Sequence, residues 1–100
     1  MTSKERAFLR SLAMNENVIF QVGKGGINEN MIKQISDALE ARELIKLRVL
    51  QNCEYTSREA AEALAAETES QVVGVVGSTF VLYRESEKHK KIDLRHLKLI

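Results

Sequence analysis

The segment VIFQVGKGGIN, residues 18–28, carries the clearest structural signals of this chain. Its first five residues are β-branched or aromatic with one glutamine, which favours a short β-strand. The glycine-rich segment Gly23-Lys24-Gly25-Gly26 then ends the strand, and Asn28 is a good N-cap for a helix over residues 29–42. The sequence therefore predicts a strand, a tight glycine loop and a helix in direct succession.

Outward from this stretch, similar signals predict the other elements. The capping-box spacing of Thr2 and Glu5 opens a first helix, and that of Thr56 and Glu59 opens an alanine-rich third helix. Alternating residues favour strands elsewhere, and Gly77-Ser78 fits a two-residue type II′ hairpin turn. The expected helices are residues 3–14, 29–42 and 57–67, and the expected strands are residues 18–22, 44–50, 71–76 and 79–84.

This order of elements predicts a fold of the α/β class. Strands separated by helices are usually parallel, and strands joined by a tight turn are antiparallel. The order helix, strand, helix, strand, helix, strand, strand therefore predicts a mixed four-stranded sheet with three helices packed on it, in a two-layer α+β arrangement.

Composition restricts the class of protein. The 100 residues are 44% hydrophobic and 29% charged, which suits one domain with one core. Charges interrupt the first twenty residues, so no secretory signal is expected, and the charge-free residues 70–83 are too few for a membrane-spanning helix. Cys53 is alone and cannot form an intramolecular disulfide, so we expect a cytoplasmic protein.

The glycine loop is the feature with the clearest chemistry. Glycines let a backbone approach a ligand closely, and the N–H groups of the following helix attract anions. The loop lacks the Ser or Thr of a Walker A motif, but Gly23-x-x-Gly26 matches the GXXG loop that clamps a nucleic-acid backbone. A plain structural turn and a binding site for a small nucleotide remain open alternatives.

Charge distribution adds to this hypothesis. The formal net charge is only +1, but residues 49–79 are acidic whereas the segments on both sides are basic. Such a molecule can present one cationic face to RNA. Five aromatic residues and no tryptophan leave little for base stacking, so most aromatics are expected in the core and base reading is expected to be minor.

Residues for catalysis or metal binding are few. His89 and His96 both lie near the C-terminus and are expected in solvent. Asp37, Glu40 and Glu43 are interpreted as an exposed acidic face of the second helix rather than as paired catalytic carboxylates. The sequence predicts no enzyme, no metal, no cofactor and no small-molecule substrate.

Three segments in order resemble the YhbY-like, or CRM (chloroplast RNA splicing and ribosome maturation), family of RNA-binding proteins. They are FQVGKGGI at residues 20–27, ALEARELIK at residues 38–46 and VVGSTFVLYR at residues 75–84. The resemblance implies a domain similar to the C-terminal domain of a bacterial translation initiation factor. It also implies binding of structured RNA, without catalysis, and association with the precursor of the large ribosomal subunit.

The resemblance also implies where RNA would bind. It places one RNA-binding domain at residues 1–86, followed by a charged tail at residues 87–100. The loop residues Gly23, Lys24, Gly25 and Gly26 match the family motif and are expected to contact RNA, as is Arg84. We expect Arg6, Arg10 and Lys33 to widen the cationic face, whereas Ser78 stands where the family often has a basic residue.

A second hypothesis gives the chain a protein partner instead. The acidic third helix, with Glu59, Glu62 and Glu67, could dock on a ribosomal or assembly protein. In both hypotheses the chain is expected to be a monomer that does not bind a membrane.

Overall fold

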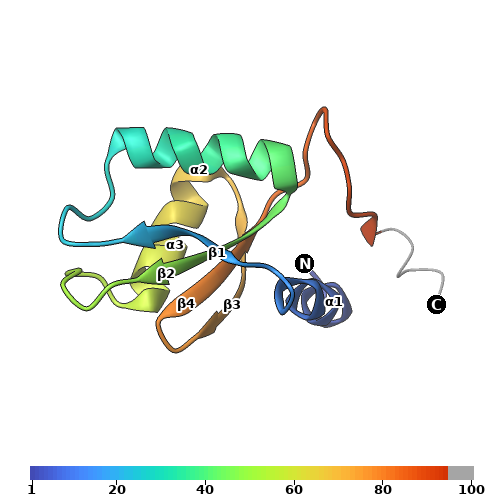
Figure 1. Cartoon of the computed structure of the whole chain (residues 1–100). Coiled ribbons are helices and arrows are strands. Elements are labelled where there is room, and N and C mark those ends of the chain that lie inside the picture. Colours follow the sequence, from blue (N-terminus) through green and yellow to red (C-terminus); the bar gives the residue numbers. More distant parts are fainter. Residues whose placement is uncertain (95–100) are drawn as a thin grey trace.

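The computed structural model describes residues 1–94, which form three helices and a four-stranded sheet (Figure 1). The order of elements is the one that the sequence predicts. The helices are α1 (Ser3–Ala13), α2 (Glu29–Arg42) and α3 (Ser57–Thr68), and the strands are β1 (Val18–Val22), β2 (Leu44–Val49), β3 (Gln71–Val76) and β4 (Thr79–Tyr83). Each boundary lies within one residue of its predicted position.

Side-chain caps explain where the helices begin. In α1 the Thr2 N–H donates to Glu5 Oε1 (2.8 Å) and the Glu5 N–H donates to Thr2 Oγ1 (3.1 Å), so both groups of the predicted capping box are satisfied. Thr56 and Glu59 form the same box at α3. Asn28 Oδ1 accepts from the Met31 N–H (2.8 Å) at the start of α2. Local sequence therefore determines all three starts.

The sheet has the strand order β1-β2-β4-β3. Strands β1 and β2 are parallel, whereas β4 is antiparallel to both of its neighbours, β2 and β3. The hairpin turn has Gly77 at φ 58°, as a glycine-first turn requires. The last strand in the sequence thus lies inside the sheet, between two strands that precede it.

Helices cover both faces of this sheet. The inward side chains Ile45 and Leu47 of β2 pack with α2 and α3 in the larger core cluster. Leu44 of the same strand points to the opposite face and packs with Leu9 and Ala13 of α1. Alternation along the strands therefore separates two apolar layers, and α1 lies across the sheet from α2 and α3. The predicted three helices and mixed four-stranded sheet are confirmed, but the helices lie on both faces and not in a single layer on one face.

The segment after β4 is tied to the end of α2 by two carboxylates. Glu40 accepts from Ser86 Oγ and from the N–H groups of Glu87 and Lys88, at 2.7 to 3.1 Å. Glu43 is fully buried and accepts from the N–H groups of Ser86, Lys91 and Ile92. The prediction that Glu43 lies on an exposed face is wrong. Its carboxylate is buried, where it accepts hydrogen bonds from backbone N–H groups.

We call this hydrogen-bonded arrangement of Glu40 and Glu43 with residues 86–92 the tail latch. It holds the first part of the predicted tail against the domain. Residues 95–100, the remainder of that tail with His96, lie outside the described residues. Within the described part, no helix is long and apolar enough to cross a membrane.

Candidate nucleic-acid interface

Three connections gather at one end of the sheet, which we call the loop end (Figure 1). They are the glycine loop after β1, residues 50–56 after β2, and the β3–β4 turn. The parallel strands β1 and β2 run toward this end together, and the Leu50 N–H donates to the Val22 carbonyl (2.9 Å). The Val49 N–H donates to the Ser78 carbonyl (2.7 Å), so the turn is fixed there too.

The three glycines of the loop differ in backbone conformation and in the space around them. Gly26 has φ 66°, a conformation that side chains rarely adopt, and its N–H donates to the Gly23 carbonyl (2.9 Å). A Cβ atom on Gly23 would lie 3.4 Å from Leu50 Cδ1. A Cβ atom on Gly25 would meet nothing within 4 Å. The backbone at Gly25 is therefore open for close approach by a ligand.

Lys24 provides the positive charge of this loop. Its side chain is exposed and, within residues 1–94, forms no hydrogen bond or ion pair. The N-termini of α2 and α3 lie at the same end, and each adds a partial positive charge. The loop end thus combines an unpaired ammonium, an open backbone and two helix N-termini, a combination that suits a phosphate group.

The other cations predicted to bind RNA are not all gathered with Lys24. Arg6 and Arg10 lie on α1, where Arg6 Nη1 donates to the Val72 carbonyl (3.3 Å) and the Arg10 stem packs over Gly74. Lys33 lies on α2, across the sheet, and pairs with Asp37 (3.4 Å). The structure therefore divides the predicted cationic face between two sides of the sheet.

Arg84 lies at the end of the sheet opposite the loop end. Its guanidinium donates from Nη1 to Ser36 Oγ (3.0 Å) and to the Thr68 carbonyl (2.8 Å), and from Nη2 to the Ser36 carbonyl (2.7 Å). These bonds join β4 to α2 and to the last residue of α3. The arrangement makes Arg84 a link between elements.

Two further residues of the loop end were not predicted from the sequence. Arg48 is exposed on β2, where it pairs in register with Gln21 and Thr79. Alternation in β2 places Arg48 on the face away from the larger core, and this alternation is visible in the sequence. Tyr55, an exposed aromatic, lies beside the glycine loop, because a Cβ atom on Gly26 would be 3.5 Å from Tyr55 Cε2. No local pattern separates Tyr55 from a core tyrosine, because its place depends on the loop packed beside it.

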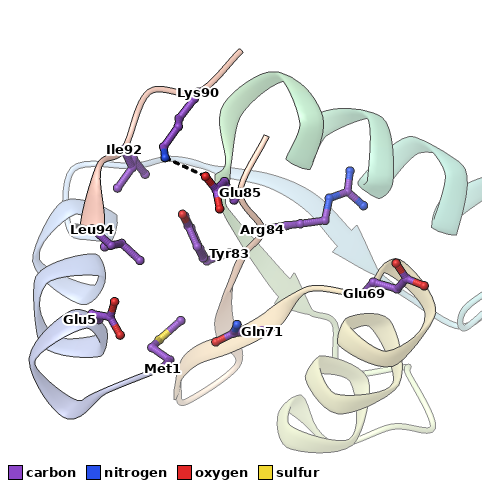
Figure 2. A pocket seen from close by; sticks show the side chains of 10 residues that line it. All are labelled: Met1, Glu5, Glu69, Gln71, Tyr83, Arg84, Glu85, Lys90, Ile92 and Leu94. Atoms are coloured by element: carbon purple, nitrogen blue, oxygen red, sulfur yellow. Dashed lines mark ion pairs between the residues drawn. The ribbon is translucent and has the colours of Figure 1, made fainter. Parts of the chain in front are cut away.

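We call the end of the sheet opposite the loop end, where Arg84 and the tail latch lie, the latch end. A hollow of about 480 Å³ there is lined by Tyr83 (Figure 2). Glu5, Glu69 and Glu85 line it, and Lys90 is paired with Glu85 (2.7 Å). Burial, followed by the nearby charge of Glu43, raises the pKa of Tyr83 to about 12. The carboxylates make this hollow a poor site for phosphate, and within residues 1–94 no His, Cys, Asp or Glu cluster could hold a metal ion.

Comparison with known proteins shows the family of this chain and agrees with its fold. Residues 1–84 match the sequence profile of the CRS1 / YhbY (CRM) domain, which includes all three segments of the resemblance. The match spans every helix and strand of the structure. The chain belongs to the CRM domain family.

Several relatives are similar over nearly their whole length. A Bacillus subtilis protein named "Probable RNA-binding protein YqeI" is 57% identical over 94 residues, which are 94% of this chain and 98% of the relative. A Haemophilus influenzae protein named "RNA-binding protein" is 33% identical and covers 90% of this chain and 91% of its own. The solution structure of SAV1595 from Staphylococcus aureus has 57% identity and a TM-score of 0.78, covering 94% and 98% of the two chains.

Proposed function

We propose that this protein binds RNA through its loop end without catalysing a reaction. The observation that carries the proposal is the exposed glycine loop, in which Lys24 is unpaired among the described residues and the backbone at Gly25 is open. An RNA phosphate needs a positive charge and N–H donors at close range. The names of the relatives support RNA as the ligand.

The electrostatic pattern supports one orientation on RNA. Lys24 and Arg48 lie at the loop end, whereas Glu62 and Glu67 are exposed on α3. A polyanion is attracted to the first pair and repelled by the second. RNA therefore contacts the loop end and leaves the outer face of α3 free.

The RNA is ribosomal in this proposal, and the protein associates with the precursor of the large ribosomal subunit. Structured ribosomal RNA offers both helical backbone and unpaired loops, and the loop end can grip a backbone without reading its sequence. Membership of the CRM family supports this choice of ligand.

Binding titrations against ribosomal RNA test the loop. At ~50 mM salt, where phosphate contacts are strong, the unaltered protein binds and its affinity falls steeply as salt rises. The Lys24→Ala variant binds more weakly to every RNA, and its salt slope is smaller by about 1 because one phosphate contact is lost. Lys24→Arg is the matched control and keeps the slope. Failure of the unaltered protein to bind at low salt would refute the proposal.

Sedimentation of a cell lysate tests the proposed association with the precursor of the large ribosomal subunit. The proposal expects the protein in fractions that contain large-subunit precursors, and expects nuclease treatment or Lys24→Ala to release it. Retention after both treatments would instead favour docking on a ribosomal or assembly protein through α3. The variants Glu62→Lys and Glu67→Lys on the exposed face of α3 would then release the protein.

A further inference from the structure

Tyr55 occupies an unusual place among the aromatic side chains. Phe80 and Tyr83 are buried in the two core clusters, Phe20 packs half-buried against the larger cluster, and Phe8 on α1 is half-buried. Tyr55 is 40% exposed and lies at the loop end, directly before the N-cap of α3. Neither core cluster includes it. Packing of the interior therefore does not account for an aromatic ring at this position.

The ring lies against the glycine loop itself. A Cβ atom built on Gly26 would lie 3.5 Å from Tyr55 Cε2, which is ordinary van der Waals distance. The positive φ of Gly26 keeps the loop backbone in this position. One edge of the ring thus lies beside Gly26, which is two residues after Lys24 in the sequence, and the residue remains 40% exposed.

Hydrogen bonds hold the backbone on both sides of this ring. The Tyr55 N–H donates to Cys53 Sγ (3.4 Å), and the Thr56 N–H donates to Glu59 Oε1 (2.9 Å). Ser57 Oγ donates to the Gly77 carbonyl (2.7 Å), which links the start of α3 to the β3–β4 turn. An aromatic on a fixed backbone loses little conformational freedom when it binds a ligand.

We propose that Tyr55 is a stacking site for one unpaired nucleobase of an RNA whose backbone lies on residues 23–26. This inference rests on the proposed function and narrows its ligand. Every base has a π-face that an aromatic ring can contact, but a base inside a duplex has both faces covered by its neighbours. The site therefore prefers single-stranded RNA or an RNA loop to a continuous duplex, with little dependence on base identity.

Tyrosine fluorescence offers a direct test. The chain has two tyrosines and no tryptophan, so Tyr83→Phe leaves Tyr55 as the only strong fluorophore. Short single-stranded oligouridylate added to this variant should quench its emission as the complex forms, while a duplex of the same length quenches less. Fluorescence anisotropy of a dye on the RNA measures binding separately. Binding without quenching would overturn the stacking proposal.

Substitutions distinguish stacking from phosphate contact. Tyr55→Leu should weaken binding of oligouridylate by about 5- to 150-fold, the range measured for loss of one stacked base, and leave the salt slope unchanged. Tyr55→Phe keeps the ring and should bind like the unaltered protein. Lys24→Ala has the opposite signature, a smaller salt slope.

The possible failures are distinguishable. If Tyr55→Leu binds as well as Tyr55→Phe while Lys24→Ala is impaired, the stacking site is refuted and the loop remains an RNA site. If the unaltered protein binds neither oligouridylate nor ribosomal RNA, the stacking site and the proposed function are both refuted. Thermal unfolding of Tyr55→Leu checks its fold, and we expect little change because the side chain belongs to neither core cluster.

Discussion

The loop end and the latch end of the sheet both carry a cation that the family resemblance assigns to RNA, but the two cations have different surroundings. Lys24 projects from the glycine loop and forms no ion pair or hydrogen bond with residues 1–94. Arg84 donates three hydrogen bonds, to Ser36 and Thr68. A positive charge is available to a ligand only where the fold leaves its donors unused.

The same contrast applies to the backbone at the two ends. At the latch end, the N–H groups of residues 86–88, 91 and 92 already donate to Glu40 and Glu43. At the loop end, a Cβ atom on Gly25 would meet no atom of the described residues within 4 Å, apart from its chain neighbours. The latch end is internally satisfied and holds elements together, whereas the loop end is left open for a ligand.

The largest expected effect is on the stability of the fold, which should depend on Arg84 and not on Lys24. Arg84→Ala should lower the free energy of unfolding by about 1.5–3 kcal/mol, because hydrogen bonds from a charged donor to Ser36 and Thr68 are lost. Arg84→Lys should be intermediate, since an ammonium cannot reproduce the fork of a guanidinium. Lys24→Ala is the control and should unfold like the unaltered protein in urea. Equal stability of Arg84→Ala and Lys24→Ala would show that the comparison is mistaken.

A smaller effect distinguishes two glycines within the loop end. Gly26→Ala should destabilise the fold by roughly 1–2 kcal/mol, because an L-residue at φ 66° is strained. Gly25→Ala should leave stability unchanged or raise it by up to about 1 kcal/mol through the unfolded chain. Its methyl group enters the open space, so RNA affinity should still fall. Thermal unfolding and RNA titration of both variants check this, and normal RNA binding by Gly25→Ala would argue against close backbone approach.

The smallest expected effect is a local response of the tail latch to acid. Bonds from Ser86 Oγ and from the N–H groups of Glu87 and Lys88 lower the pKa of Glu40 from 4.5 to about 2. The ionised carboxylate therefore favours the latched state, fully above pH ~4.5 and progressively less as the pH falls toward ~2. The amide chemical shift of Lys88 should titrate over this range, and this change should be smaller in Glu40→Gln. Shifts that stay constant down to pH ~2 would contradict this role of Glu40.

Much of the fold was predictable because its signals are local. Thr2, Asn28 and Thr56 each begin a helix through bonds to residues three positions away, and such spacing is legible in sequence. The position of β4 between β2 and β3 was not predictable, because strand order depends on contacts between distant segments. The burial of Glu43 was hidden for the same reason, since its partners lie more than forty residues away.

The candidate site also has one part that was predictable from the sequence and one part that was not. The glycine loop is a continuous motif, so Lys24 and its neighbours were found without a structure. Tyr55 and Arg48 lie at the same end of the sheet as that loop only because β1 and β2 are parallel and end together. Arg84 was assigned by motif alone, and its bonds to α2 and α3 became apparent only from the structure. Its role in RNA binding remains a prediction.

The position of β4 also has a consequence for folding as the chain leaves the ribosome. Until residues 79–83 emerge, the edge of β2 that will pair with them is open, and β3 has no neighbour in the sheet. The pairing of β2 with β4 joins segments that are distant in sequence and must wait for loop closure, which slows folding. We therefore expect a nascent chain that ends before β4 to expose unpaired strand edges, with the sheet completed only once β4 has emerged.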